Sequence, residues 1–121
     1  MTGEDALRRW MAGYERAWKS NDPGDIGALF TDDATYRTLP TRPPHTGRRA
    51  IVDWWLEHAD QPGDYTFTWE PLSVAPDGLA FVAGRTIYPG LGKDFENLWV
   101  LRLDGDGRCS DFTEWWIEYE K

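Results

Sequence analysis

The amino-acid sequence predicts an α+β domain in which the helices come first and a long antiparallel meander follows. Apolar residues recur at helical spacing in the first half of the chain, and they alternate with a period of two between tight turns in the second half. The 121 residues also include 8 Trp, 5 Tyr and 5 Phe, more ring surface than one simple core of this size can hide. We therefore expect a curved, cone-like antiparallel sheet closed by three N-terminal helices, with rings lining a cavity or covering a second sheet face.

Three segments read as helices, and each has a start signal. The first carries an apolar stripe that includes Trp10 and Tyr14, with Thr2 as a capping residue. Asp22 followed by Pro is a start signal for the second, and Thr46 is expected to cap the third. The expected helices are residues 4–20, 23–30 and 47–59.

The strand segments are separated by turn signals such as Pro76-Asp77-Gly78 and residues 104–107. Several strands are apolar on both faces, and the long ones should curl because strands twist. Three helices can cover only one face of the sheet, so we expect the convex face to meet a second copy of the chain as a homodimer. The expected strands are residues 34–39, 65–70, 79–88, 95–103 and 108–119.

Length and composition limit the class of protein. We expect residues 1–121 to form a single domain. The net charge of −8 disfavours nucleic acid and anionic membrane surfaces as partners. No apolar run is long enough for a transmembrane helix, and the acidic start lacks the apolar core of a signal peptide. Cys109 is the single cysteine, which fits a cytoplasmic location.

Two charged residues stand out because they interrupt apolar strand faces. Arg85 shares a face with Phe81 and Ile87, and Glu114 shares one with Trp116. A buried charge costs several kcal/mol unless it is paired and hydrogen-bonded. Two interpretations remain open: an ion pair with a purely structural role, or a polar centre in an apolar pocket. Tyr36, just before a proline-rich loop, is the third candidate for such a centre.

The sequence shows no pattern typical of a metal or cofactor site. His45 and His58 are not at a metal-ligand spacing, and we expect His58 to interact with the C-terminal end of its helix. A glycine-rich phosphate loop, a Cys/His cluster and a nucleophile elbow are all missing from the sequence. We therefore expect neither a metal nor a cofactor.

The order of elements and several short segments resemble the SnoaL-like branch of the nuclear transport factor 2-like (NTF2-like) superfamily. This resemblance covers nearly the whole chain and implies a cone-shaped, cystatin-like α+β barrel with a pocket at its mouth and frequent dimers. The superfamily includes ketosteroid isomerases, polyketide cyclases, epoxide hydrolases, dehydratases and non-enzymatic binders. The matching segments are residues 14–18, 28–36, 47–51, 97–100 and 106–108.

A more distant resemblance is to the limonene epoxide hydrolases. Segment 36–40 keeps that family's Tyr and Pro, with Thr38 in place of an Asn. Arg85 matches a strand Arg of the family, Ile87 stands where its Asp would be, and Glu114 matches its last-strand carboxylate. The resemblance implies that the residues that hold the water, Tyr36, Thr38 and Glu114, are partly retained. The acid that would protonate the epoxide is missing. The pair of acids used by ketosteroid isomerases is not evident either.

Two functional classes follow from these observations. The first is an enzyme that moves a proton on an apolar, cyclic small molecule by isomerisation, cyclisation or hydration, with Glu114 as acid or base and Arg85 and Tyr36 beside it. The second is a non-catalytic pocket protein or structural dimer, which the missing second acid would favour. The expected ligand-binding residues are Trp10, Tyr14, Thr38, Trp55, Trp69, Ile87, Trp99, Phe112 and Trp116.

Overall fold

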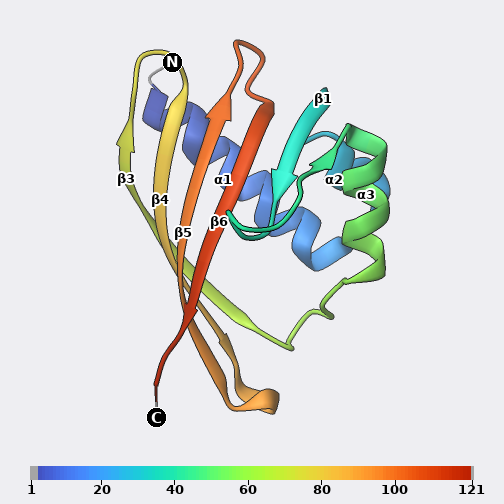
Figure 1. The fold of residues 1–121 in the computed structure, drawn as a ribbon, viewed down its shortest axis with the longest axis vertical. Helices are drawn as coiled ribbons and strands as arrows, with labels where there is room; N and C mark the ends of the chain where they lie inside the picture. The colour runs from blue at the N-terminus through green and yellow to red at the C-terminus, as the bar shows by residue number, and fades with distance from the viewer. Residues whose placement is uncertain (1–2, 121) are drawn as a thin grey trace.

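The structure is a computed structural model that describes residues 3–120. Three helices precede most of a six-stranded sheet, in which the strands follow the order β2-β1-β6-β5-β4-β3 (Figure 1). The helices are α1 (Gly3–Ser20), α2 (Pro23–Gly27) and α3 (Arg48–Glu57), and a 3-10 turn, η1, spans Pro89–Leu91. The strands are β1 (Phe30–Arg37), β2 (His45–Thr46), β3 (Thr66–Val74), β4 (Leu79–Tyr88), β5 (Lys93–Leu103) and β6 (Cys109–Glu118).

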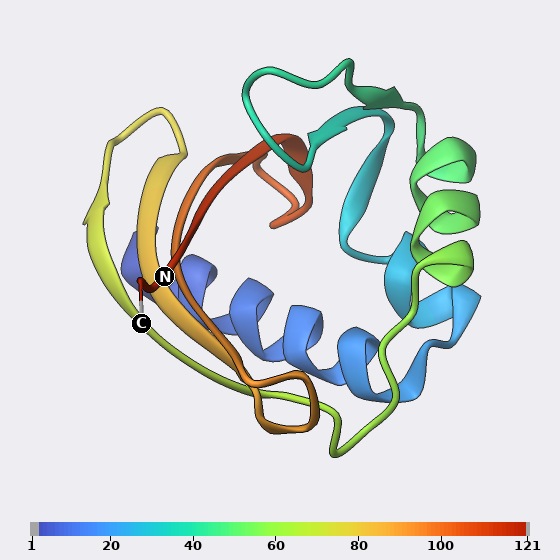
Figure 2. The ribbon, with the colours of Figure 1, turned by 60° about the horizontal axis from the view of Figure 1, so that its bottom comes forward.

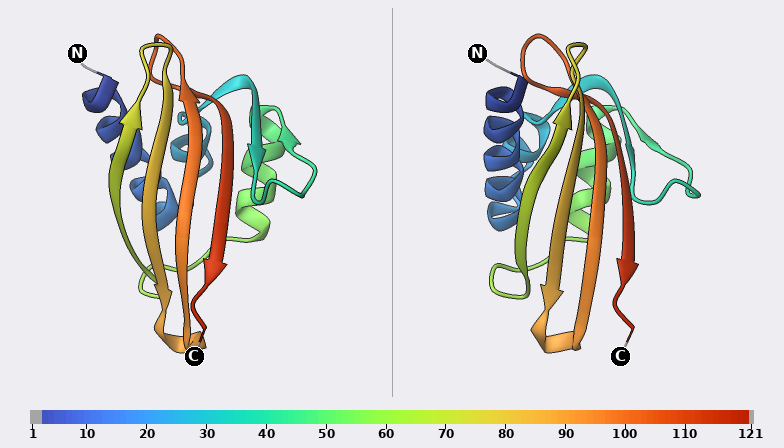
Figure 3. Two further views of the ribbon diagram at one scale, coloured as in Figure 1. Left: turned by 60° about the vertical axis from the view of Figure 1, so that its left-hand side comes forward. Right: turned by 90° about the vertical axis from the view of Figure 1, so that its left-hand side faces the viewer.

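The sheet curves strongly and is not closed into a barrel. Figure 2 shows β3 to β6 wrapping around one side of α1, with α3 on the opposite side, and Figure 3 shows the long strands running side by side. The predicted meander is confirmed, because β3, β4, β5 and β6 pair antiparallel in sequence order. Strand β1, in contrast, pairs parallel to β6, which the predicted all-antiparallel sheet did not include.

Helix boundaries follow the start signals in part. Asp22 caps α2 as predicted, since its side chain accepts from the backbone of Gly24 and Asp25 at 2.7 and 3.2 Å. The expected cap at Thr46 is wrong: Thr46 pairs with Thr35 in the short strand β2, and Gly47 occupies the cap position of α3 without a side-chain hydrogen bond. The predicted cap at Thr2 lies outside the described residues.

Rings fill the space between α1 and the sheet. Trp10 and Tyr14 of α1 pack against Phe112 of β6, with ring centroids 6.2 and 6.1 Å apart. Phe112 also stacks on Tyr36 at 4.7 Å. Part of this core also borders a cavity, because Tyr14, Tyr36, Trp55 and Trp99 are both core residues and lining residues. Within the described residues, no helix combines the length and apolarity that a membrane crossing needs.

We predict that the hairpin between β3 and β4 requires glycine at position 78. Gly78 has a φ of 91°, and a Cβ there would lie 2.1 Å from the backbone oxygen of Leu103. Gly78→Ala should lower the free energy of unfolding by about 2 kcal/mol or more. Gly105→Ala is the control, because a Cβ at Gly105 meets nothing within 4 Å. Urea denaturation of both variants gives the comparison, and equal stabilities would contradict it.

Candidate functional site

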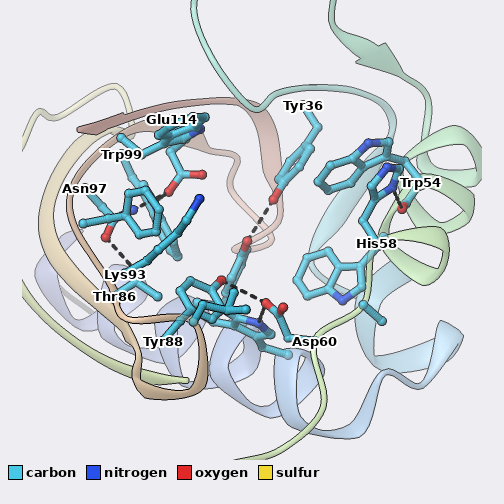
Figure 4. A pocket seen from close by; sticks show the side chains of 17 residues that line it. Tyr36, Trp54, His58, Asp60, Thr86, Tyr88, Lys93, Asn97, Trp99 and Glu114 are labelled. Atoms are coloured by element: carbon cyan, nitrogen blue, oxygen red, sulfur yellow. Dashed lines mark hydrogen bonds between the residues drawn. The ribbon is translucent and has the colours of Figure 1, made fainter. Parts of the chain in front are cut away.

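A cavity of about 410 Å³ lies on the concave side of the sheet, beside the ring core (Figure 4). Its walls come from α1, α3, the loop after α3, and strands β1, β4, β5 and β6. Such a volume is typical of sites for small molecules. The lining residues are Tyr14, Trp18, Tyr36, Trp54, Trp55, His58, Ala59, Asp60, Thr86, Tyr88, Leu91, Lys93, Phe95, Asn97, Trp99, Glu114 and Trp116.

Glu114 places a carboxyl group inside this cavity. It faces inward because it alternates with Phe112 and Trp116 on the concave side of β6, directly opposite Trp99 on β5. Its Oε2 accepts hydrogen bonds from Trp99 Nε1 at 2.7 Å and from Asn97 Nδ2 at 2.8 Å. Among the described residues its Oε1 has no hydrogen-bond partner, and the carboxyl group is directed into the cavity (Figure 4).

Burial changes the acidity of this group. Removal from water raises the pKa of Glu114 from 4.5 to about 7, because the charged form loses its hydration. The hydrogen bonds from Trp99 and Asn97 act in the opposite direction and offset part of this shift. A carboxyl group with a pKa near neutrality is populated in both protonation states at physiological pH, which suits it to proton transfer.

A buried hydrogen-bond chain orients the amide that contacts Glu114. Thr86 Oγ1 donates to Asn97 Oδ1 at 2.8 Å, and the opposite end of the amide then donates to Glu114. Both side chains are buried, at 4% and 8% exposure. Because Thr86 satisfies the amide oxygen, Asn97 presents its nitrogen to the carboxylate. This chain holds Oε2 of Glu114 in place and leaves Oε1 for a ligand.

Two tyrosine hydroxyls lie deeper in the same cavity. The hydroxyls of Tyr14 and Tyr36 are 2.8 Å apart, and either can be the donor. Burial is the main cause that raises the pKa of both groups, and the charge of Glu114 adds to the effect. Both therefore stay neutral. Since one hydroxyl hydrogen is used between them, the other is available to donate to a ligand atom.

A second carboxyl group, Asp60, lines the cavity from the loop after α3. Its Oδ2 accepts from Tyr88 Oη at 3.0 Å and from Trp18 Nε1 at 3.1 Å. Its backbone oxygen accepts from Asn21 Nδ2 at 2.8 Å. Figure 4 shows Asp60 and Glu114 on opposite walls of the cavity. The cavity thus contains the second acid that the sequence did not reveal.

His58 and Lys93 add nitrogen groups to the lining. His58 stacks on Trp54 with ring centroids 4.7 Å apart, and its Nδ1 lies 2.9 Å from the Trp54 backbone oxygen. The predicted contact of His58 with the end of its helix is therefore confirmed. His45 stacks on the same indole at 5.1 Å, and burial lowers the pKa of this imidazole. Lys93 reaches in from the beginning of β5 (Figure 4).

The structure brings together six of the residues selected from the sequence and separates the other six from the cavity. Those that line it are Tyr14, Tyr36, Trp55, Trp99, Glu114 and Trp116. Those that are not among the lining residues are Trp10, Thr38, Trp69, Arg85, Ile87 and Phe112.

The prediction that Arg85 and Glu114 face the same cavity is wrong, and the strand register gives the reason. Arg85 pairs with Glu96 across β4 and β5 and lies on the convex face, whereas its neighbour Thr86 faces inward. Its guanidinium forms an ion pair with Asp94 and lies 4.8 Å from the ring centre of Tyr119. Arg85 therefore neither balances Glu114 nor reaches the cavity. Ile87 has the same parity and lies on the convex face with it.

The remaining four belong to the core or to its edges. Trp10 donates through Nε1 to the Leu29 backbone oxygen at 2.9 Å, and Phe112 is 1% exposed among the rings of the core. Thr38 is buried beside Arg42, which donates to its hydroxyl at 3.2 Å. Trp69 packs against the hydrophobic core, and its ring lies under the guanidinium of Arg8 at 5.7 Å.

Sequence reasoning missed several polar residues of the site. Asn97 had a usable signal, because it is a polar residue between Phe95 and Trp99 on one strand face. Asp60 had none, since it lies in a polar loop where an aspartate is ordinary. Within residues 3–120, no group of three His, Cys, Asp or Glu side chains is arranged to hold a metal ion.

Comparison with known proteins identifies the family of the chain. A family model described as the SnoaL-like domain matches residues 7–112 of the chain. No curated protein matches it significantly.

Solved structures with the same fold include two NTF2-like proteins of unknown function. The one from Burkholderia xenovorans LB400 has a TM-score of 0.76 and 14% identity, over 98% of this chain and 88% of that chain. The one from Mesorhizobium loti has a TM-score of 0.72 and 20% identity, over 97% and 95%. A ketosteroid isomerase candidate from Kribbella flavida DSM 17836 has a TM-score of 0.72 and 21% identity, over 97% and 82%. At these identities the likeness concerns the fold.

Proposed function

This chain belongs to the SnoaL-like domain family, and we propose that it binds an apolar, cyclic small molecule in the cavity and moves a proton on it with Glu114. The aromatic walls support this ligand class, because indole and phenol rings stack well on flat or alicyclic groups. Trp54, Trp55, Trp99 and Trp116 all line the cavity. The volume of about 410 Å³ leaves room for a ligand of one or two rings.

The environment of Glu114 is the single observation that carries the proposal. One carboxyl oxygen is fixed by Trp99 and Asn97, the other is directed into the cavity, and burial raises the pKa of the group to about 7. A carboxylate that only stabilised the fold would have both oxygens satisfied or a cation beside it. Among the described residues, no ion pair involves Glu114.

The arrangement supports proton abstraction from carbon followed by proton return. Ionised Glu114 would take a proton from an activated C–H group of the ligand through Oε1. The free hydroxyl hydrogen of the Tyr14 and Tyr36 pair would donate to the ligand oxygen on which negative charge develops. Returning the proton to another carbon gives an isomerisation. Attack of the resulting carbanion on a carbonyl carbon of the same ligand, whose oxygen then takes up the proton, gives a cyclisation. If Glu114 takes the proton from a water molecule instead, the hydroxide can add to a polarised double bond and the proton return to its other carbon, which gives a hydration.

A general-base probe tests this function without knowledge of the natural substrate. In 5-nitrobenzisoxazole, a base takes the ring C–H proton, the electron pair forms a nitrile, and the N–O bond breaks to release a coloured phenolate. We expect the protein to accelerate this reaction over free acetate at equal concentration. Because the ionised carboxyl group is the base, the rate should rise with pH and reach its midpoint at about pH 7. Binding without acceleration would favour the alternative, a non-catalytic ligand-binding protein.

We also propose that the chain forms a homodimer through the convex face of the sheet. An apolar set of side chains lies there across β4, β5 and β6: Phe81, Ala83, Leu98, Val100, Trp115 and Ile117. Trp115 is 39% exposed and Ile117 is 69% exposed in the single chain. Their burial against a second copy would remove this apolar area from water. The single cysteine, Cys109, supports a cytoplasmic location for this dimer.

Ile117→Lys should weaken such a dimer by about 100-fold or more, because it would bury an unpaired charge at the interface. Leu91→Lys is the matched control, since Leu91 is also 69% exposed but belongs to η1 at the mouth of the cavity. Sedimentation at micromolar concentration should find the parent and the control dimeric and the Ile117 variant monomeric. A monomeric parent would contradict the proposed assembly.

A further inference from the structure

The carboxylate of Asp60 uses one of its two oxygens in the hydrogen bonds that hold the loop after α3. Tyr88 and Trp18 both donate to its Oδ2, and these bonds tie the loop to β4 and α1. No hydrogen bond to its Oδ1 is found among residues 3–120. The side chain is half-buried and lines the cavity. One oxygen of this carboxylate is therefore held rigidly, and the other is available to a ligand.

Within residues 3–120, Asp60 takes part in no ion pair. The ion pairs within residues 3–120 join Arg8, Arg48, Arg85 and Arg102 to other acids. Lys93, the only lysine or arginine among the lining residues, forms no ion pair in the described part of the chain. Figure 4 shows its ammonium group on the strand side of the cavity, away from Asp60. A carboxylate that is partly withdrawn from water gains most from a positive partner.

The neighbours of Asp60 are rings. Trp18 and Tyr88 contact the carboxylate directly, and Tyr65 stacks on Trp18 with ring centroids 4.0 Å apart. Trp55 is joined to the same loop through Asn21, which contacts both the indole nitrogen and the Asp60 backbone. Burial, followed by the charge of Asp60, raises the pKa of Tyr65 to about 12. Aromatic faces beside a carboxylate form a favourable environment for an organic cation.

We propose that the cavity selects a cyclic ligand that carries a protonated amine, whose ammonium group binds Asp60 while its ring extends toward Glu114. This inference rests on the proposed function and specifies its ligand class. The net charge of −8 adds a long-range attraction for cations. Because Asp60 and Glu114 lie on opposite walls, an amine held at Asp60 directs the apolar part of the molecule to the oxygen that would take the proton.

The test compares two probes that differ in one group, 2-phenylethylammonium and 2-phenylethanol. Their affinities are measured by titration calorimetry at about pH 6, where Glu114, with a pKa of about 7, is mostly protonated. We expect the parent to bind the ammonium probe at least about 10-fold more tightly than the alcohol. Asp60→Asn should remove this preference and change the affinity for the alcohol by less than about 3-fold. The amide oxygen can still accept from Trp18 and Tyr88, so the loop should keep its position.

Asp53→Asn is the matched control. It removes the same charge from an exposed position on α3 and should keep the preference for the amine. Equal affinity of the parent for the two probes would overturn the inference and leave the proposed function standing. A preference that survives in Asp60→Asn would also overturn it, as would a preference lost equally in Asp53→Asn. If neither probe binds the parent, both the inference and the proposed apolar cavity site are wrong.

Discussion

Glu114→Gln is expected to slow the ring opening of 5-nitrobenzisoxazole by at least about 100-fold and to leave binding of the probe nearly unchanged. Glutamine has the shape of glutamate, and its amide oxygen can accept from Trp99 and Asn97 as the carboxylate does. It cannot take a proton at neutral pH. The change therefore removes the base while it keeps the cavity, so the loss should appear in kcat rather than in KM.

Glu118→Gln is the control for this prediction. It removes one carboxylate from an exposed position at the end of the same strand. Its rate and its pH profile should match those of the parent. If Glu114→Gln retains the rate of the parent, another group is the base, and the account of Glu114 is wrong. Double substitution of Glu114 and Asp60 would then show whether the second carboxyl group is responsible.

Phe112→Ala is expected to lower the free energy of unfolding by about 3–5 kcal/mol. Phe112 is 1% exposed, and its ring lies 4.7 Å from that of Tyr36 and 5.1 Å from that of Trp99. Removal of the ring leaves a void that these neighbours cannot fill, because Tyr36 is held by its hydrogen bond to Tyr14. Urea denaturation of the parent and the variant measures the difference.

Leu72→Ala serves as the comparison, because Leu72 is 56% exposed and should lose less than about 1 kcal/mol. The result also decides between two roles for Phe112. The sequence suggested a ligand-binding ring, whereas the structure places it in the core. A Phe112→Ala variant that keeps the stability of the parent but no longer binds a cyclic probe would show that Phe112 contacts the ligand.

The fold could be predicted because local patterns and topology agreed. The stripe of α1 and the alternation in β4 to β6 are strong periodic signals, and the tight turns permit little but a meander. The parallel pairing of β1 with β6 was not predictable in this way, because it depends on a contact between distant segments. The two-residue strand β2 is too short to leave any periodic signal.

The sequence correctly predicted a cavity-lining residue where a single charged residue interrupts an apolar strand face. Glu114 breaks an apolar face and is indeed in the cavity. The same rule failed for Arg85, because β4 is apolar on both faces and its inward set includes Gly84 and Thr86. Gly84 is needed there: a Cβ would lie 2.8 Å from the ring of Phe67. Because close packing requires a small residue at position 84, the inward face of β4 has fewer large apolar residues in the sequence than its outward face.

The protonation of Glu114 is the property on which the proposed chemistry depends most directly. It can be measured by carbon NMR of the protein labelled at the glutamate carboxyl carbon, with the resonance assigned by its loss in Glu114→Gln. The account predicts a titration midpoint at about pH 7, because burial outweighs the hydrogen bonds from Trp99 and Asn97. A midpoint near the ordinary value of 4.5 would show a well-hydrated carboxylate and would contradict its assignment as the base of an apolar cavity.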